Sequence, residues 1–383
     1  MNFRHKLIIP AANLITGMCG FYLSMYQISV LQISEVFKLS SFMMGVIVAA
    51  QFAGFIVPPF VLGTLCERIG KRGVMMIALP LMILGTFLIS VTNNIILFIA
   101  GVLIIGAGFS VTEGTICAVL ATEFGKRSTF HLGIAQASFS LGAVISPLTC
   151  EALFAAGFKY NELFGIMSVV FLVLFILFSL TKQEYDVKDG CNTGILGALR
   201  FFRRKVFIFI SVAMVMYVGA EGVIAFFTDS WFEVTLKAPH LSALALSLFW
   251  AGMIPTRLLL GAIKLRPRTT IIGCAAGVLL CILAVIIARS HTVMLIAFAG
   301  LGVFCGPCWP LIIDVVAKKY PANAGTASNL MVALGGLGGS LMPVAAGALV
   351  AGANFMPVFF VSAACAAVMA AMFFFAGREK TGR

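Results

Sequence analysis

Two glutamates, Glu113 and Glu221, stand inside long apolar stretches of the sequence. An ionisable side chain at the centre of a membrane costs about 2.5 kcal/mol or more, so it usually has a function there. Low polarity disfavours the charged form of a carboxyl, and its protonation then responds to a bound substrate and to the side from which water enters. We predict that Glu113 carries a coupling proton and that Glu221 supports it. A structural hydrogen bond is the alternative for each residue.

Neutral polar and aromatic residues in the apolar stretches could recognise a polar substrate. An amide side chain can hydrogen-bond to a polyol, and an aromatic ring can stack on the apolar face of the same molecule. The candidates for substrate binding are Gln27, Gln51, Gln136, Tyr217, Trp250, Trp309 and Asn329. Hydrogen bonds between helices and anchoring at the lipid interface explain any one of them about as well.

A cation, Arg257, lies in the apolar stretch Leu241–Ile263, and an acid, Asp314, lies in the stretch Val293–Ala317. These are the eighth and tenth of the stretches given below, and both residues lie near the ends that are predicted below to be cytoplasmic. An unpaired arginine at that depth would be costly. We therefore predict a structural ion pair between these two residues.

The composition as a whole is that of an integral membrane protein. Of the 383 residues, 61% are hydrophobic and the mean hydropathy is +1.09, whereas soluble proteins contain about 45–50% apolar residues. A helix needs about 20 apolar residues to span a membrane. Sliding-window reasoning predicts twelve spans, near Leu7–Leu31, Ser41–Cys66, Val74–Val91, Ile95–Leu120, Leu132–Ala156, Leu163–Leu180, Val206–Trp231, Leu241–Ile263, Ile271–Ala288, Val293–Ala317, Gly325–Ala351 and Phe355–Ala376.

Lysine and arginine collect on one side of this layout, as expected for cytoplasmic loops. Only Lys38, Lys159, Lys237 and Arg289 fall on the other side, and Arg257 falls inside a span. Both termini are therefore predicted to be cytoplasmic, in a multi-pass protein of the cell membrane, or of the inner membrane in a Gram-negative cell. The net charge of +12 follows from this topology and predicts no nucleic-acid binding.

A charged loop with two glycines separates the second and third predicted spans. From Gly63 to Arg72 it resembles Gly-x-x-x-Asp-Arg-x-Gly-Arg-Arg, the loop signature of the major facilitator superfamily, with Glu67 in place of the aspartate. Gly63 lets two helices approach closely, and Gly70 permits a turn that residues with a Cβ resist. The loop residues expected to control conformational exchange are Gly63, Glu67, Arg68, Gly70, Lys71 and Arg72.

The chain also divides into two halves with similar patterns. Its only long polar stretch predicts an N-terminal six-helix bundle at 1–181, a cytoplasmic linker at 182–205 and a C-terminal six-helix bundle at 206–383. The segment Ala53–Gly63 is similar to Ala251–Gly261 at the equivalent helix of the second half. The superfamily resemblance implies an all-α membrane fold of twelve transmembrane helices in two pseudo-symmetric bundles, with a substrate site between them.

Shorter segments resemble the fucose/proton symporter branch of this superfamily. The run Tyr217-Val218-Gly219-Ala220-Glu221 looks like the seventh-helix segment of that branch. The segments containing Glu113 and Gln136 are similar to its fourth and fifth helices. The first helix departs from the branch, because Asn13–Gln32 contains no acid. The resemblance therefore supplies no coupling acid in the first helix.

One motif is similar to a thioredoxin redox site, Cys305-Gly306-Pro307-Cys308. Redox chemistry of that kind needs solvent access, and this motif lies inside the tenth predicted span. We interpret Gly306 and Pro307 as a break in a membrane helix.

These features together predict a secondary active transporter that works by alternating access, and not an enzyme. The resemblance favours proton-coupled uptake of a sugar or a similar small polar metabolite, and a proton-driven exporter of drugs or metabolites is the alternative. The expected partners are the small-molecule substrate, protons and the lipid bilayer, and we expect a monomer. We expect no cofactor and no metal ion, because the four histidines fall at span ends or in loops.

Overall fold

The computed structural model describes residues 3–124, 128–180, 200–260, 266–288, 290–320 and 324–377, and these ranges form helices joined by turns, without a β-strand. The N-terminal half contains α1 (Phe3–Phe37), α2 (Ser41–Ala53), α3 (Pro58–Val91), α4 (Ile95–Phe124), α5 (Ser128–Ala155) and α6 (Tyr160–Leu180). The C-terminal half contains η2 (Arg200–Arg203), α8 (Lys205–Ser230), η3 (Trp231–Thr235), η4 (Pro239–Leu241), α9 (Ser242–Leu259), α10 (Pro267–Ile287), α11 (His291–Cys305), α12 (Cys308–Lys319), α13 (Ala324–Leu349) and α14 (Pro357–Ala376). The predicted all-α fold is confirmed.

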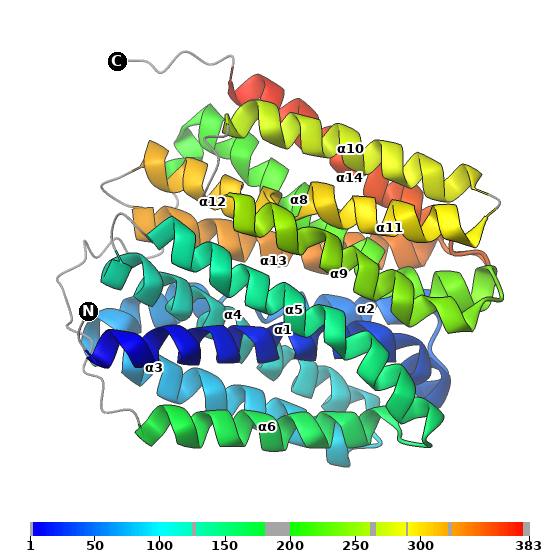
Figure 1. Ribbon diagram of the computed structural model, residues 1–383, viewed down its shortest axis with the longest axis horizontal. Helices are drawn as coiled ribbons and strands as arrows, with labels where there is room; N and C mark the ends of the chain where they lie inside the picture. The colour runs from blue at the N-terminus through cyan, green and yellow to red at the C-terminus, as the bar shows by residue number, and fades with distance from the viewer. Residues whose placement is uncertain are drawn as a thin grey trace.

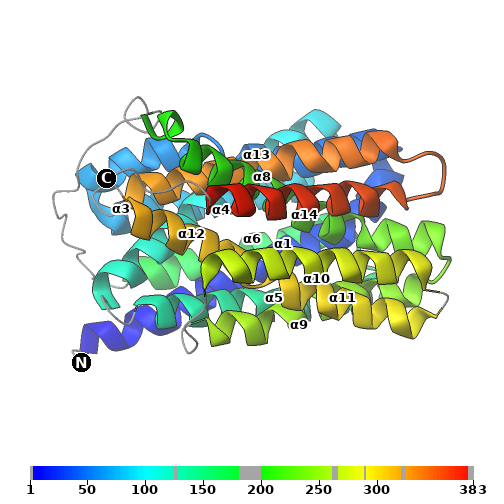
Figure 2. The ribbon, with the colours of Figure 1, turned by 90° about the horizontal axis from the view of Figure 1, so that it is seen from above.

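The long helices lie side by side along one direction, with the N-terminal half below the C-terminal half (Figure 1). Helix α1 begins and α14 ends at the same end of the bundle, on the left in both views (Figure 1 and Figure 2). An even number of crossings brings the two chain ends together in this way. We call this end the terminal end and the opposite one the far end.

The helices account for the predicted membrane spans. Eleven described segments are long and apolar enough to cross a membrane, and α2 adds a shorter apolar helix of 13 residues. Helix α2 and the start of α3 together form the second predicted span. Helices α11 and α12 together form the tenth. The chain is therefore a multi-pass membrane protein.

Helix α3 changes direction at Gly70, between the second and third predicted spans. Gly70 has φ 71° and ψ 166°, a backbone region that is essentially restricted to glycine. The structure thus places a glycine-dependent turn where the loop signature indicates one.

Replacing Gly70 should cost stability through the backbone alone. We expect Gly70→Ala to lower the free energy of unfolding by about 1–3 kcal/mol, because a Cβ strains this conformation. Thermal unfolding of the detergent-purified protein measures the change. The control is Gly273→Ala, at a helical glycine whose added Cβ would meet nothing within 4 Å. Equal unfolding temperatures for the two variants would contradict the strain.

Much of the loop before this turn is described by its backbone only. Gly63, Glu67 and Arg68 lie outside the residues whose side chains the structure describes, so their role in conformational exchange stays a prediction. Arg72 is described, and its Nη2 atom donates to the carbonyl oxygen of Ser179 at 2.9 Å. Carbonyl groups in the last turn of a helix lack partners within that helix. Arg72 therefore ties the start of the third span to the end of α6.

Two spans are interrupted. The break between α11 and α12 falls at Gly306 and Pro307, as the sequence predicts. A second break, between Ala53 and Pro58, interrupts the span that we expected to be continuous. Proline lacks an N–H donor and disfavours the helical conformation of the residue before it, so Pro58 starts a new helix.

The two halves touch backbone to backbone at the far end. There Gly45 of α2 lies against Pro343 of α13, and Gly347 of α13 lies against Ser41. A Cβ on Gly45 would come within 2.5 Å of the Pro343 carbonyl oxygen, which is closer than van der Waals contact allows. The close approach of α2 and α13 therefore requires glycine at position 45.

Candidate functional site

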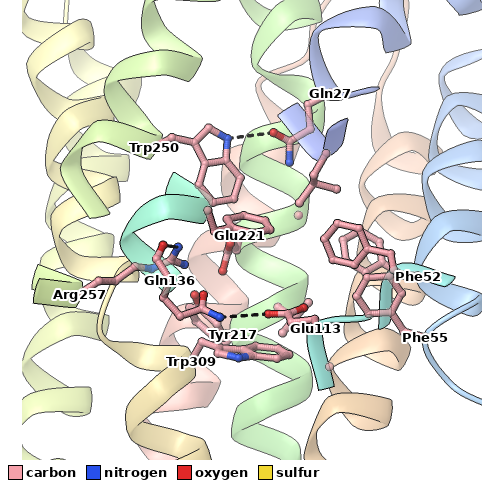
Figure 3. Close-up of a pocket in the computed structure, with 16 residues that line it drawn as sticks. Gln27, Phe52, Phe55, Glu113, Gln136, Tyr217, Glu221, Trp250, Arg257 and Trp309 are labelled. Carbon is pink, nitrogen blue, oxygen red and sulfur yellow. Dashed lines mark hydrogen bonds between the residues drawn. The ribbon is translucent and has the colours of Figure 1, made fainter. Parts of the chain in front are cut away.

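A buried cavity lies between the two halves (Figure 3). Its volume is ≈ 70 Å³. Both halves contribute to its walls, through Leu23, Gln27, Phe52, Phe55, Phe109, Glu113, Gln136, Phe139, Tyr217, Val218, Glu221, Gly222, Trp250, Arg257, Trp309 and Gly335. This volume is small beside that of typical ligand pockets, which is about 300–1,000 Å³.

The cavity brings together most of the residues singled out from the sequence. Both glutamates line it, and so do Gln27, Gln136, Tyr217, Trp250 and Trp309. Two other candidates lie elsewhere. Gln51 is fully buried and its Oε1 accepts a hydrogen bond from the Tyr22 hydroxyl at 2.9 Å, which joins α1 to α2. Asn329, on α13, is not among the lining residues.

The two carboxyls come from opposite halves. Glu113 lies on α4, and its Oε1 accepts a hydrogen bond from Gln136 Nε2 on α5 at 3.3 Å. Glu221 lies on α8, one helical turn after Tyr217, whose hydroxyl is close to its carboxyl without forming a well-aligned hydrogen bond. Figure 3 shows both carboxyl groups facing the same space. A proton on either one can therefore respond to the same bound molecule.

A tryptophan and a glutamine connect the halves on another side of the cavity. Trp250 Nε1 on α9 donates to Gln27 Oε1 on α1 at 3.0 Å. The indole also packs edge-on against Phe139, with ring centroids 5.6 Å apart. Since the amide oxygen of Gln27 is occupied, its amide nitrogen is left to donate to a ligand.

Removing this indole donor should modestly weaken the apparent affinity of the predicted transporter for its substrate. We expect Trp250→Phe to raise the half-saturating substrate concentration for exchange about 2–10-fold, because a buried hydrogen bond is worth roughly 0.5–1.5 kcal/mol. Exchange of labelled substrate in proteoliposomes measures the effect. Trp231→Phe is the matched control, because the buried Nε1 of Trp231 has no hydrogen-bond partner in the described part of the chain. An equal effect of both substitutions would contradict a specific role for the bond.

The predicted ion pair between Arg257 and Asp314 is wrong. Asp314 pairs instead with Lys318, four residues later on α12, at 2.6 Å. The Arg257 guanidinium is buried and reaches across to α5, where Nη1 donates to Ser140 Oγ at 2.7 Å and to the Gln136 carbonyl oxygen at 3.2 Å. These two bonds orient the Arg257 side chain toward the N-terminal half, where it lines the cavity.

No signal in the sequence marks the apolar walls of the cavity. Phe52, Phe55, Phe109 and Phe139 line the cavity, but the chain contains 35 phenylalanines, so their type alone marks none of them. For Arg257 a signal existed, since it was the one cation placed inside a predicted span. Within the described residues, no group of three or more His, Cys, Asp or Glu side chains could hold a metal ion.

A cavity with a few polar groups between two bundles of membrane-spanning helices is the arrangement of a carrier for small molecules. The sequence pattern of the Major Facilitator Superfamily matches residues 12–288 and 210–383. The chain therefore belongs to the Major Facilitator Superfamily. Its relatives and its fold are those of transporters and not of enzymes.

Characterised relatives are distant. The chain is 22% identical to the glucose/mannose transporter of Bacillus subtilis (strain 168), over 80% of this chain and 79% of that protein. It is 26% identical to the nitrite extrusion protein of the same strain, over 74% of this chain and 72% of that protein. It is also 26% identical to the L-fucose-proton symporter of Escherichia coli (strain K12), over 50% of this chain and 51% of that protein.

Solved structures share the fold over almost the full length. The crystal structure of the E. coli fucose:proton symporter has a TM-score of 0.71, covering 97% of this chain and 98% of that one at 19% identity. A nucleoside transporter has a TM-score of 0.78, covering 98% of this chain and 100% of that one at 15% identity. These likenesses establish the arrangement of the helices.

Proposed function

We propose that the protein is a proton-coupled secondary transporter that takes up a sugar or a similar small polar metabolite by alternating access. The observation that carries this proposal is a cavity between the halves in which Glu113 and Glu221 face the same space as amide and indole groups. Relatives named as a glucose/mannose transporter and an L-fucose-proton symporter support it.

The proposed mechanism uses contacts that cross between the halves. Substrate enters the cavity while it is open to one side, and Glu113 takes up a proton there. Closure re-forms the Trp250–Gln27 bond and the Arg257–Ser140 bond around the loaded site, both of which join the two halves. Opening to the other side breaks one set of contacts between the halves, and rehydration of Glu113 then favours release of its proton.

The cavity must widen to hold a substrate. Its volume of ≈ 70 Å³ is well below the about 300–1,000 Å³ of typical ligand pockets. A single sugar ring or a similar metabolite therefore enters when the two halves move apart. The faces of Trp250 and Trp309 can stack on its apolar side, while Gln27 and Gln136 are the amide groups that can bind its hydroxyls.

Proton-driven export is the second candidate. It is favoured by the absence of an acid in Asn13–Gln32 and by the relative named as a nitrite extrusion protein. In an exporter, the proton and the substrate cross in opposite directions.

One experiment separates the two candidates whatever the orientation of the protein in the vesicle. Proteoliposomes contain a pH-sensitive dye, and substrate is added outside without any imposed proton gradient. A symporter acidifies the lumen as substrate enters, whereas an exchanger of substrate for protons makes the lumen alkaline. A protonophore must abolish either signal. A lumen that stays at constant pH while labelled substrate enters would refute proton coupling in both forms.

The proposal extends to topology and assembly. Both termini are placed in the cytoplasm, because the basic residues collect on the loops of that side. The location is the cell membrane, or the inner membrane of a Gram-negative cell, and the working unit is a monomer. The division of the chain at 181/182 falls outside the described residues, so the domain boundaries also stay part of the proposal.

A further inference from the structure

Arg257 carries a charge in the cavity for which the proposed function gives no role. Its side chain is 3% exposed, and a guanidinium stays protonated under all ordinary conditions. A permanent charge in the apolar interior of a membrane bundle needs compensation.

The partners of Arg257 in the protein are neutral. They are the Ser140 hydroxyl, the Gln136 carbonyl and, at 3.5 Å from Nε, the Gly306 carbonyl. The guanidinium also lies over the Phe139 ring, 5.9 Å from its centroid. Among the described residues no carboxylate lies within ion-pair distance of it, and these bonds use Nη1 and Nε. The Nη2 side of the fork is therefore left for a ligand in the cavity.

The charges of the cavity constrain what can cross together with one proton. When one of the two glutamates is protonated, the other balances Arg257 and the empty cavity has no net charge. Loading one proton on the second glutamate adds a positive charge, which a neutral substrate cannot balance. A substrate with one negative charge balances it. From this starting state, a monoanion is the cargo that keeps the loaded cavity neutral as well, and a net charge in an apolar interior is costly.

We propose that the transported molecule is a small hydroxylated carboxylate and that Arg257 binds its carboxylate group. This inference rests on the proton-coupled transport proposed above and names the substrate class of the same site. A planar carboxylate matches the fork of a guanidinium. The amide nitrogen of Gln27 and the faces of Trp250 and Trp309 then take the hydroxylated remainder of the molecule.

The test is equilibrium binding, followed as the rise in unfolding temperature of the detergent-purified protein at pH 7. The probes are matched pairs that differ in one carboxylate: glucuronate with glucose, galacturonate with galactose and gluconate with sorbitol. We expect at least one acid to bind ten or more times as tightly as its neutral partner. Arg257→Gln should weaken binding of that acid at least tenfold. Arg257→Lys should recover part of the affinity, because it keeps the charge and loses the fork.

Two further variants separate binding from folding. Ser140→Ala removes a hydrogen bond of Arg257 but keeps its charge, so it should lower stability and retain the preference for acids. Arg268→Gln removes a guanidinium that binds the carbonyl oxygens of Phe374 and Gly377, away from the cavity, and should bind acids as the wild type does. If Arg257→Gln does not fold, the comparison of Arg257→Lys with Ser140→Ala decides.

Three outcomes would overturn the inference: neutral partners binding as tightly as the acids, no stabilisation by any acid, or an acid preference that survives replacement of Arg257. Stabilisation by nitrite alone, with no effect of the carboxylates, overturns it as well. Failure of the proposed function looks different. Acids would then bind through Arg257, while the dye-filled vesicles would show substrate entry without a change in pH.

Discussion

Glu113→Gln should abolish proton-driven accumulation of substrate and leave substrate exchange intact. Glutamine mimics the permanently protonated carboxyl, and its amide can still take part in the contact with Gln136 (3.3 Å in the wild type). The loaded carrier can therefore cross in both directions, but it no longer releases a proton. We expect the accumulation ratio under an imposed proton gradient to fall to about one, while counterflow of labelled substrate stays within a few-fold of the wild type.

Two other glutamates provide the comparison. Glu162→Gln changes an exposed residue whose Oε2 accepts from the Lys159 N–H at 2.7 Å, a bond that an amide oxygen can keep, so accumulation should be normal. Glu221→Gln should weaken binding while the remaining transport still depends on the gradient. Normal accumulation by Glu113→Gln vesicles would show the assignment to be wrong, and Glu221 would be the next acid to test.

Gly45→Ala should slow transport strongly without touching the cavity. Its Cβ would lie 2.5 Å from the Pro343 carbonyl oxygen and 2.8 Å from Val344 Cα, so α2 and α13 must separate when this end closes. Overpacking of this kind costs about 1–3 kcal/mol, which makes the closed far end roughly 5–150-fold less populated. We expect the exchange rate to fall about tenfold or more, with little change in substrate affinity.

A second glycine controls for the change in helix propensity. Gly273→Ala also replaces a helical glycine by alanine, and its Cβ would meet nothing within 4 Å. Its exchange rate should equal that of the wild type. If Gly45→Ala also exchanges substrate at the wild-type rate, closure at the far end does not require the close approach of α2 and α13.

The sequence predicted the membrane fold well because its signals are strong and local. Long apolar runs mark spans, basic residues mark loops, and glycine at position 70 marks a turn with positive φ. The break before Pro58 was missed, because two prolines near the start of an apolar run are compatible with either a kinked or an interrupted helix. The residue pair Gly306 and Pro307 was easier to interpret, since it falls in the middle of a span.

The sequence predicted most of the polar residues of the candidate site, but it did not predict which residues they bind. An isolated amide or tryptophan in a span signals a contact without naming the partner. Gln51 and Gln27 therefore looked alike, although one binds Tyr22 and the other Trp250. Arg257 was matched with Asp314 because a sequence offers only opposite charge and similar depth as criteria. Which helices are neighbours decides the actual partners, and this information is spread over the whole fold.

Closing at the far end takes little conformational entropy from side chains. A glycine, alanine or proline has no rotamers to lose on burial, whereas a long side chain such as methionine or glutamine gives up as much as about 2 kcal/mol of TΔS. The contact of α2 with α13 includes three such residues, Gly45, Pro343 and Gly347, and it is made largely with backbone atoms. The side-chain entropy of this contact should therefore add little temperature dependence to the equilibrium between its open and closed forms.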